Sequence, residues 1–470
     1  MRKILFSLAV LLMAASVANA QTVKYNQYGV AVESDVLDAE SQDGFLVIES
    51  PKSNYKIWFD NRIQVDGAGF FGAPEYADPI GSGVGIRRAR FAIKAQVDKN
   101  WYGEFDMDLA NGLVELKDAI VRYTGLPHFE IQAGNFKENF SIQRNSSSRY
   151  LLMIERPMVC SALAPSRHLG FNVKYDNPWI WVSTGIFGQE VAGSEEWTNV
   201  ADNNKDFGRG IKIFSDQPTG FAVTNKVVLR PLFKLENASL HIGAAHSFRT
   251  TLASMATGEW GTYRASARNS TSINRKKYLD TNNLKNYSHN HLWTVELAGH
   301  WNGLRYEAAY IGDKVFFNDS TDPASVTTNS FGGWYVQAGY LLFGGRQRYD
   351  SKGAKYTRPE RGQKWGDLEL CARYEFCNLN DFGENVKNKV YGGSAEAYTV
   401  GLNYWVTNNV RMQLNYQYNN NDRYATGKGK LNVGLDAAGN PTKDYTKVVT
   451  PSGKAGVDYH MVALRFEVDF

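Results

Sequence analysis

The sequence predicts an all-β protein, a transmembrane antiparallel β-barrel of about 16 strands, and three observations support this fold class. The chain starts with a pattern that is typical of export. It is rich in aromatic residues, although its mean hydropathy of −0.40 is polar. Many of its segments alternate between apolar and polar residues, as strands with one face in lipid and one in water would.

Residues 1–20 have the pattern of a secretory signal peptide. Arg2 and Lys3 precede an apolar run over residues 4–17, and Ala18-Asn19-Ala20 supplies small residues for cleavage. The apolar run is shorter than the roughly 18 residues that a helical membrane span needs, and no longer run follows it. We therefore expect this segment to be removed from an exported chain.

The composition fits a barrel better than a set of soluble domains. The chain holds 25 Phe, 26 Tyr and 11 Trp, and barrels gather such residues at the two membrane interfaces. Its 52 Lys and Arg nearly balance 48 Asp and Glu, so net charge gives no reason to expect nucleic acid as a partner. No linker divides residues 56–470, which we expect to form one barrel domain.

The three cysteines, Cys160, Cys371 and Cys377, do not indicate a disulfide framework, because three cannot all pair within the chain. Cys371 and Cys377 lie on one predicted strand, about 20 Å apart at the strand rise per residue, which is too far for a disulfide. We interpret all three as structural.

Alternation locates the strands. It is clearest at residues 57–66, and in residues 101–109 it places Tyr102, Glu104 and Asp106 on the water-facing side. Short turns alternate with long connections, as periplasmic turns and external loops do in such barrels. The predicted strands are 57–66, 87–97, 101–109, 116–124, 128–136, 168–176, 179–189, 221–231, 239–249, 291–301, 304–314, 331–343, 366–376, 396–406, 410–420 and 459–470.

Two segments do not fit this scheme easily. Residues 344–365 are too long for a periplasmic turn, so they could add to the strand count. Residues 21–55, which we assign to a periplasmic N-terminal segment, alternate only weakly around Phe45-Leu46-Val47-Ile48.

The last strand alternates to the end of the chain. Val462, Leu464 and Phe466 share one face, while Arg465 and Glu467 share the other. The chain then ends on Phe470, and a terminal aromatic of this kind resembles the signal that the barrel assembly machinery reads. We expect that machinery and outer-membrane lipid to be partners.

Several motifs resemble the phosphate-selective porin O and P family. They are Leu116-Lys117-Asp118-Ala119, Gly125-Leu126-Pro127, Gly134-Asn135-Phe136-Lys137-Glu138-Asn139-Phe140-Ser141, Met153-Ile154-Glu155-Arg156 and Leu163-Ala164-Pro165-Ser166-Arg167-His168-Leu169-Gly170. The resemblance implies a homotrimer of sixteen-stranded barrels in the bacterial outer membrane. It also implies that the third external loop folds inward as a constriction, and that small anionic solutes such as phosphate pass through it.

The loop over residues 137–167 carries the candidate anion-binding residues. Five cations against Glu138 and Glu155 give it a net charge of +3, and rings of basic side chains favour anions in a pore. The candidates in this loop are Lys137, Ser141, Arg144, Arg149, Arg156 and Arg167. Arg62, Arg88, Arg90 and Lys94 form a second basic set on inward strand faces, which we expect to guide anions along the pore.

Other interpretations stay open at this stage. Asp60, Asp66, Glu104, Asp106 and Asp108 face the same lumen, which favours a general-diffusion porin nearly as well. The basic and aromatic loop 251–290 would suit a surface receptor. Gly81-Ser82-Gly83-Val84-Gly85 lacks the helix that a phosphate-binding glycine loop needs, and His289-Asn290-His291 has no further metal ligand nearby. We therefore expect no catalytic residues, no metal site and no cofactor.

Overall fold

The computed structural model describes residues 24–470 except 33–35, 51, 53, 75–78, 111, 113, 189–190, 192–219, 251–260, 319–325, 383–388, 423–424, 427–429, 432–433, 443–446 and 450–455. The expected signal peptide, residues 1–20, lies outside the described residues. Among the residues that the structure describes, no helix is long and apolar enough to cross a membrane.

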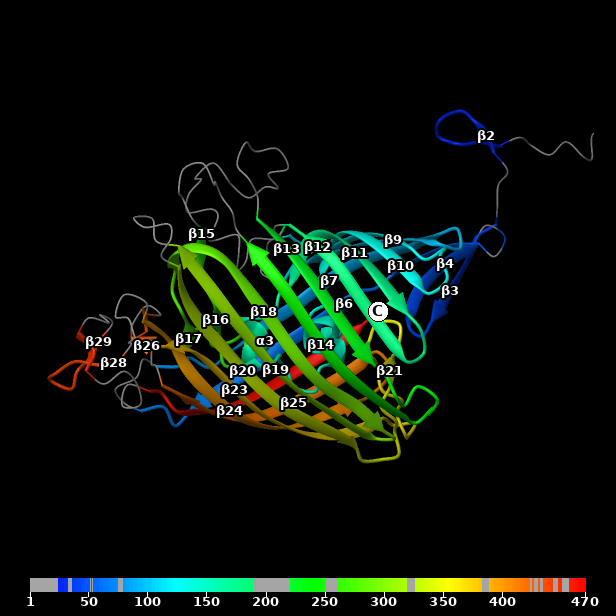
Figure 1. Cartoon of the computed structure of the whole chain (residues 1–470). Helices are drawn as coiled ribbons and strands as arrows, with labels where there is room; N and C mark the ends of the chain where they lie inside the picture. The colour runs from blue at the N-terminus through cyan, green and yellow to red at the C-terminus, as the bar shows by residue number, and fades with distance from the viewer. Residues whose placement is uncertain are drawn as a thin grey trace, which may run out of the picture.

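Sixteen antiparallel strands within the described residues close into one barrel, which confirms the predicted fold class (Figure 1). In order along the chain they are β6 (Arg62–Phe71), β7 (Gly83–Val97), β8 (Trp101–Asp108), β9 (Glu115–Tyr123), β10 (Phe129–Lys137), β11 (Arg167–Asp176), β12 (Ile180–Phe187), β13 (Phe221–Leu229), β14 (Ala238–Thr250), β18 (Leu284–Trp301), β19 (Leu304–Asn318), β20 (Val326–Leu341), β23 (Asp367–Asp381), β24 (Val390–Trp405), β25 (Val410–Asn421) and β30 (Tyr459–Asp469).

The last strand closes the barrel against the first. β30 pairs antiparallel with β6 from His460 opposite Phe71 to Asp469 opposite Arg62. Beyond this ladder the Phe470 N–H donates to the Asn61 carbonyl at 3.2 Å. Closure pairs the backbone groups that an edge strand would expose to lipid. Recognition of Phe470 by the assembly machinery stays a prediction.

The alternation read from the sequence matches the two faces of the wall. Along β30, Arg465 and Glu467 are buried in the lumen, whereas Leu464 and Phe466 are about half exposed on the outer face. A register shift interrupts the pairing of β6 with β7, because Gln64 pairs with Arg88 and Val65 pairs with Ile86. The extra residue is Arg87, and this β-bulge turns its side chain toward the lumen as well.

The first predicted strand, 57–66, is divided in two. β5 (Tyr55–Phe59) and β6 are separated by Asp60 and Asn61, and both pair with β7. β3 (Asp38–Gln42) and β4 (Phe45–Ser50) continue the same sheet, since β4 pairs with β5 and β3 with β4. β1 (Lys24–Tyr25) and β2 (Ala31–Val32) form a separate two-stranded sheet.

The long connection after β20 adds no strand to the barrel. It forms a hairpin of β21 (Tyr349–Asp350) and β22 (Lys355–Tyr356), which lies against the lumen side of the barrel wall. The Tyr356 hydroxyl donates to the carbonyls of Gly299 at 2.7 Å and Tyr306 at 2.6 Å. The strand count therefore stays at sixteen for the described residues.

The remaining short elements belong to the loops. β15 (Gly261–Tyr263) pairs with β18, and β16 (Ser266–Ala267) pairs with β17 (Leu279–Asp280). β26 (Ala425–Thr426), β27 (Lys430–Leu431), β28 (Gly434–Leu435) and β29 (Pro441–Thr442) form two further hairpins. α2 (Ile142–Asn145), the 3₁₀ turn η1 (Ser148–Tyr150) and α3 (Met158–Ala162) lie between β10 and β11.

Candidate functional site

The segment between β10 and β11, residues 138–166, enters the barrel and crosses its lumen, and we call it the inward loop. Its apolar residues Phe140, Met158, Val159 and Leu163 pack against inward-facing side chains of β18, β19, β20 and β23. Most inward-facing positions of the barrel are polar. These four strands differ, because they also carry apolar residues on the lumen side, such as Ile311 and Phe331. The loop therefore fills one side of the bore by hydrophobic contact.

Arginines of this filled side bind the backbone of the inward loop. Arg411 donates to the Leu151 carbonyl at 3.0 Å, and Arg465 donates to the Ile154 carbonyl at 2.6 Å. Arg305 and Arg373 do the same for Tyr150 and Glu155, both at 2.7 Å. Because these backbone groups lie away from bulk water, each bond removes the cost of an unpaired carbonyl.

Carboxylates of the same side accept from loop N–H groups. The Ile142 N–H donates to Glu296 Oε1 at 2.6 Å, and the Met158 N–H donates to Glu375. Glu296 also pairs with Lys226 at 2.6 Å in a contact where both side chains are fully buried. The inward loop is thus fixed at several points along its length.

The start of the inward loop has its own anchor. Glu138 is buried and accepts from Arg249 at 2.8 Å and from Thr224, and its carboxylate also lies 2.6 Å from His168 Nδ1. Burial alone would raise the pKa of Glu138, but the attraction of Arg249 and His168 lowers it to about 2. The carboxylate is therefore ionised at neutral pH.

The motif that precedes this anchor contains a glycine with a structural requirement. Gly134 has a φ of +127°, which side chains rarely adopt, and a Cβ there would lie 1.9 Å from the Ala119 carbonyl oxygen on β9. Only glycine lets β9 and β10 approach so closely just before the loop turns inward.

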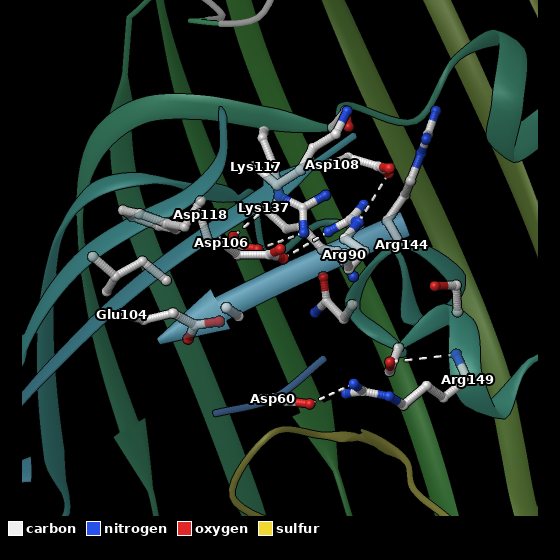
Figure 2. Close-up of a pocket in the computed structure, with 18 of the residues that line it drawn as sticks. Asp60, Arg90, Glu104, Asp106, Asp108, Lys117, Asp118, Lys137, Arg144 and Arg149 are labelled. Carbon is white, nitrogen blue, oxygen red and sulfur yellow. Dashed lines mark hydrogen bonds and ion pairs between the residues drawn. The ribbon is translucent and has the colours of Figure 1, made fainter. Parts of the chain in front are cut away.

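The rest of the bore remains open between the inward loop and the wall of β6 to β12. This channel cavity has a volume of about 450 Å³ and is lined by fourteen Lys and Arg residues and seven Asp and Glu residues, a formal excess of seven positive charges (Figure 2). Its basic residues are Arg62, Arg87, Arg88, Arg90, Lys94, Lys117, Arg122, Lys137, Arg144, Arg149, Arg156, Arg167, Lys174 and Lys355.

Part of this positive charge is neutralised by carboxylates. Arg90 pairs with Asp106 at 2.7 Å and with Asp108 at 3.0 Å. Arg167 pairs with both oxygens of Asp118, at 3.0 and 2.5 Å. Lys94 pairs with Asp60, Arg149 pairs with Asp60 and Asp469, and Arg87 pairs with Glu155. Four of the predicted site residues, Arg90, Lys94, Arg149 and Arg167, are therefore paired with carboxylates.

Six lining cations pair with no carboxylate that the structure describes, and we call them the unmatched cations. Arg62 donates to Ser148 Oγ at 2.9 Å, and Arg88 donates to Gln64 Oε1 at 2.7 Å. Lys137 and Arg156 both donate to the Ser146 carbonyl, at 3.2 and 2.9 Å. The unmatched cations are Arg62, Arg88, Lys137, Arg144, Arg156 and Lys355.

Three unmatched cations, Lys137, Arg144 and Arg156, lie close together on and beside the inward loop. Arg144 donates to the carbonyls of Ala164 at 3.1 Å and Ser161 at 3.4 Å, which leaves the rest of its guanidinium toward the cavity. Burial, together with the repulsion from Arg144, lowers the pKa of Arg156 to about 9. Arg156 is still charged at neutral pH, and an anion placed between the two would relieve that repulsion.

Ser141 has a different place from the other candidates. It is fully buried, it caps α2 by accepting from the Arg144 N–H at 3.5 Å, and it does not line the channel cavity. Its role in this structure is to shape the loop that carries Arg144.

The sequence did not predict a second basic cavity, which adjoins the channel cavity. Its volume is about 920 Å³, and it shares Arg87, Arg144 and Glu155 with the channel cavity, so the two are continuous. Arg264, Arg268, Arg275 and Lys277 of the loop 251–290 line it. This loop folds into the barrel, where Ser270 Oγ donates to Glu375 at 3.0 Å. The count of basic residues in this loop was visible in the sequence, but its inward path was not.

Three carboxylates in the channel cavity lie close enough to share an ion. Oxygens of Glu104, Asp106 and Asp118 lie within 4.8 Å of one another. Each already faces a cation, however, since Lys94, Arg90 and Arg167 pair with them respectively. This group is accounted for by those ion pairs.

The chain is similar to several known proteins. The family model of phosphate-selective porin O and P matches residues 59–439. Porin O of Pseudomonas aeruginosa is 21% identical over 412 residues, which cover 82% of this chain and 88% of that protein. An uncharacterized protein of Caulobacter vibrioides is 26% identical over 366 residues, and the matched part spans 76% of this chain and only 66% of that relative. The outer-membrane channel DcaP of Acinetobacter baumannii superposes with a TM-score of 0.47 at 11% identity, covering 90% of this chain and 99% of that one.

Proposed function

Because this chain belongs to the phosphate-selective porin O and P family and is an outer-membrane channel, we propose that it conducts small anions, phosphate or polyphosphate among them, by passive diffusion. The observation that carries this proposal is the set of unmatched cations in the channel cavity. A buried cation without a carboxylate partner is costly, and a passing anion compensates that cost.

The chemistry of these groups suits phosphate. Arginine presents a planar fork that contacts two oxygens at once, and lysine adds a mobile point charge. Lys137, Arg144 and Arg156 offer both types beside the inward loop, while Arg62 and Arg88 offer further guanidinium groups on the wall. The basic second cavity would raise the local anion concentration before the narrow part is reached.

The alternative is a general-diffusion porin, and the paired carboxylates favour it. Eight of the fourteen lining cations face an acidic partner. If those ion pairs determine the electrostatic field in the channel cavity, cations and anions would pass nearly equally. The surface-receptor interpretation is less supported, because the described part of the loop 251–290 lies largely inside the barrel.

The test compares two triple variants in planar bilayers. The first carries Lys137→Gln, Arg144→Gln and Arg156→Gln, and the second carries Arg346→Gln, Arg348→Gln and Arg361→Gln, which remove three charges outside both basic cavities. Reversal potentials under a KCl gradient should show an anion preference in the native protein and in the second variant. The first variant should lose most of that preference, and phosphate should no longer compete with its chloride current. An unchanged reversal potential in the first variant would contradict the proposal.

We also propose a homotrimer. The resemblance implies it, and the barrel wall supports it, because β8 and β12 have only 8 residues whereas β18 has 18. A tilted strand needs about 9–11 residues to cross the hydrocarbon layer, so the short wall would be covered better by a second barrel than by lipid. Native mass in detergent measures the assembly, and the mass of one chain would contradict it.

A further inference from the structure

The outer surface of the barrel has an apolar groove that the channel does not use. It runs over β13, β14, β18, β19 and β20, on the wall that faces the viewer in Figure 1, and has a volume of about 590 Å³. Small side chains form its floor, Ala244 and Ala308, and larger ones form its sides, Ile242, Val295, Leu297 and Val336. Its surface is almost wholly hydrocarbon, so it suits an acyl chain rather than a polar ligand.

The groove has a defined depth in the membrane. Trp293 and Tyr310 stack with ring centroids 4.9 Å apart at its external end, next to Trp334. Trp301 and Tyr340 are exposed at the other end of the same strands. Aromatic residues of a barrel gather at the two lipid interfaces, so the groove lies within the hydrocarbon layer.

A cluster of three histidines and one lysine lies just beyond the external end of the groove, and we call it the rim cluster. His246 Nε2 and His291 Nδ1 are 3.1 Å apart, and the ring of His289 stacks on Phe316 at 4.4 Å. Lys314 on β19 pairs across the strands with His291 and lies 5.6 Å from the Phe316 ring. The sequence showed His289 and His291 but gave no sign that His246 would join them.

The rim cluster and the groove share one face of the same strands. His289, His291, Trp293, Val295 and Leu297 occupy alternate positions of β18 and therefore all point outward. From His291 to Val295 the strand rises by about 13 Å. A molecule with its chain in the groove would thus have its head group at the rim cluster.

The rim cluster has a chemical preference. Its four side chains pair with no carboxylate that the structure describes, and they supply imidazole N–H donors and one ammonium group. Such a set complements an anionic head group with several oxygens and disfavours a cationic one.

We propose that this outer face binds an acylated lipid whose head group carries phosphate, with its chain in the groove and its phosphate at the rim cluster. The external end of the strands places that head group in the outer leaflet. The site is separate from the pore, since the side chains that form the rim cluster and the walls of the groove point away from the lumen.

The test measures lipid bound per chain by native mass spectrometry on the full-length protein in detergent. The probes are diphosphoryl lipid A and the same lipid without its phosphates. The rim variant carries His246→Gln, His289→Gln, His291→Gln and Lys314→Gln, and the groove variant carries Ala244→Leu and Ala308→Leu. His460→Gln is the control for the rim variant, because His460 also lies among outward aromatic rings, 5.2 Å from Phe71, but away from the groove. Ala372→Leu, an outward substitution outside the groove, is the control for the groove variant.

The expected results separate the two parts of the site. The rim variant should bind diphosphoryl lipid A about tenfold more weakly and no better than the dephosphorylated lipid. The groove variant should bind both lipids more weakly, and both controls should behave as the native protein does. Unchanged conductance shows that each variant is folded.

Three results would overturn the proposal. Equal binding of the two lipids by the native protein would remove the role of phosphate. Release of the lipid by a chelator would show that a divalent cation, rather than the rim cluster itself, holds the head group. Displacement of the lipid by millimolar inorganic phosphate would show an anion site that needs no acyl chain.

Discussion

The two sides of the bore both carry rows of arginine, but they use them differently. On the side of β18 to β30, arginines such as Arg411 and Arg465 donate to carbonyls of the inward loop and also face carboxylates. On the side of β6 to β12, Arg62 and Arg88 face only neutral oxygen atoms. The same residue type therefore builds structure on one side and leaves net charge on the other.

The position of the carboxylates explains this difference. Glu296, Glu369, Glu375 and Glu467, all on strands between β18 and β30, are buried where the inward loop is fixed. The channel cavity instead has twice as many basic as acidic residues. The filled side holds the inward loop in place through paired charges, whereas the open side carries an excess of positive charge.

The largest effect on this comparison should come from the fully buried pair of Glu296 and Lys226. Glu296→Gln leaves the Lys226 ammonium without its carboxylate, and breaking a buried pair from one side costs about 3–5 kcal/mol. We expect a loss of that size in the free energy of unfolding in urea, together with a noisier and wider channel. Glu360→Gln, in an exposed pair with Arg348, is the control and should cost below about 1 kcal/mol. Equal losses in the two variants would contradict the contrast.

Acid should release the start of the inward loop through Glu138. Its pKa is about 2 in the folded protein, against an ordinary value of 4.5. A lowered pKa stabilises the folded state fully above the ordinary value, and this contribution, about 3 kcal/mol, is lost as pH falls from about 4.5 through about 2. Current fluctuations recorded across that interval should rise in the native protein.

Glu138→Gln supplies the control for this pH dependence. Without an ionisable group at that position, fluctuations should already be high at neutral pH and should change less below pH 4.5. Identical pH profiles of the native and variant channels would show that Glu138 is not the group responsible.

Two single arginine substitutions sharpen the comparison between the two sides. Arg156→Gln removes an unmatched cation and should lower the anion-to-cation permeability ratio about fivefold, which corresponds to ~1 kcal/mol, with little loss of stability. Arg411→Gln removes a donor to the Leu151 carbonyl and should lower stability by about 1–3 kcal/mol while changing selectivity less. Reversal potentials measure the selectivity of both variants, and urea unfolding measures their stability. A larger selectivity loss in Arg411→Gln than in Arg156→Gln would contradict the comparison.

Most of the barrel was predictable because each membrane-spanning strand must alternate. Each predicted range overlaps one of the sixteen barrel strands, but several bounds differ, and β18 begins at Leu284 rather than at residue 291. Residues 284–290 do not alternate regularly, because a register shift lies between Tyr287 and His289. Backbone pairing nevertheless continues there, with β15 at Leu284 and with β19 from Tyr287 onward.

The candidate site was predictable in its residue types but not in its pairing. The sequence located the cations of the inward loop, yet it gave no indication that Asp118 would neutralise Arg167 or that Arg144 would lack a partner. Such pairs join strands through the closed sheet, and their geometry follows from register. The bulge that turns Arg87 inward, and the inward path of Arg264 and Arg268, depend on tertiary contacts in the same way.

The smallest expected effect concerns Ser141, and it separates loop shape from loop charge. Its hydroxyl caps α2 and is remote from the channel cavity. Ser141→Ala removes one cap, which typically costs about 1 kcal/mol, and leaves Arg144 and Arg156 charged. Urea unfolding should therefore show a small loss, while the reversal potential stays at its native value. Because a solute can respond to the loop only through the side chains that reach the cavity, a large change in selectivity here would mean that the cap, rather than the unmatched cations, determines which ions pass.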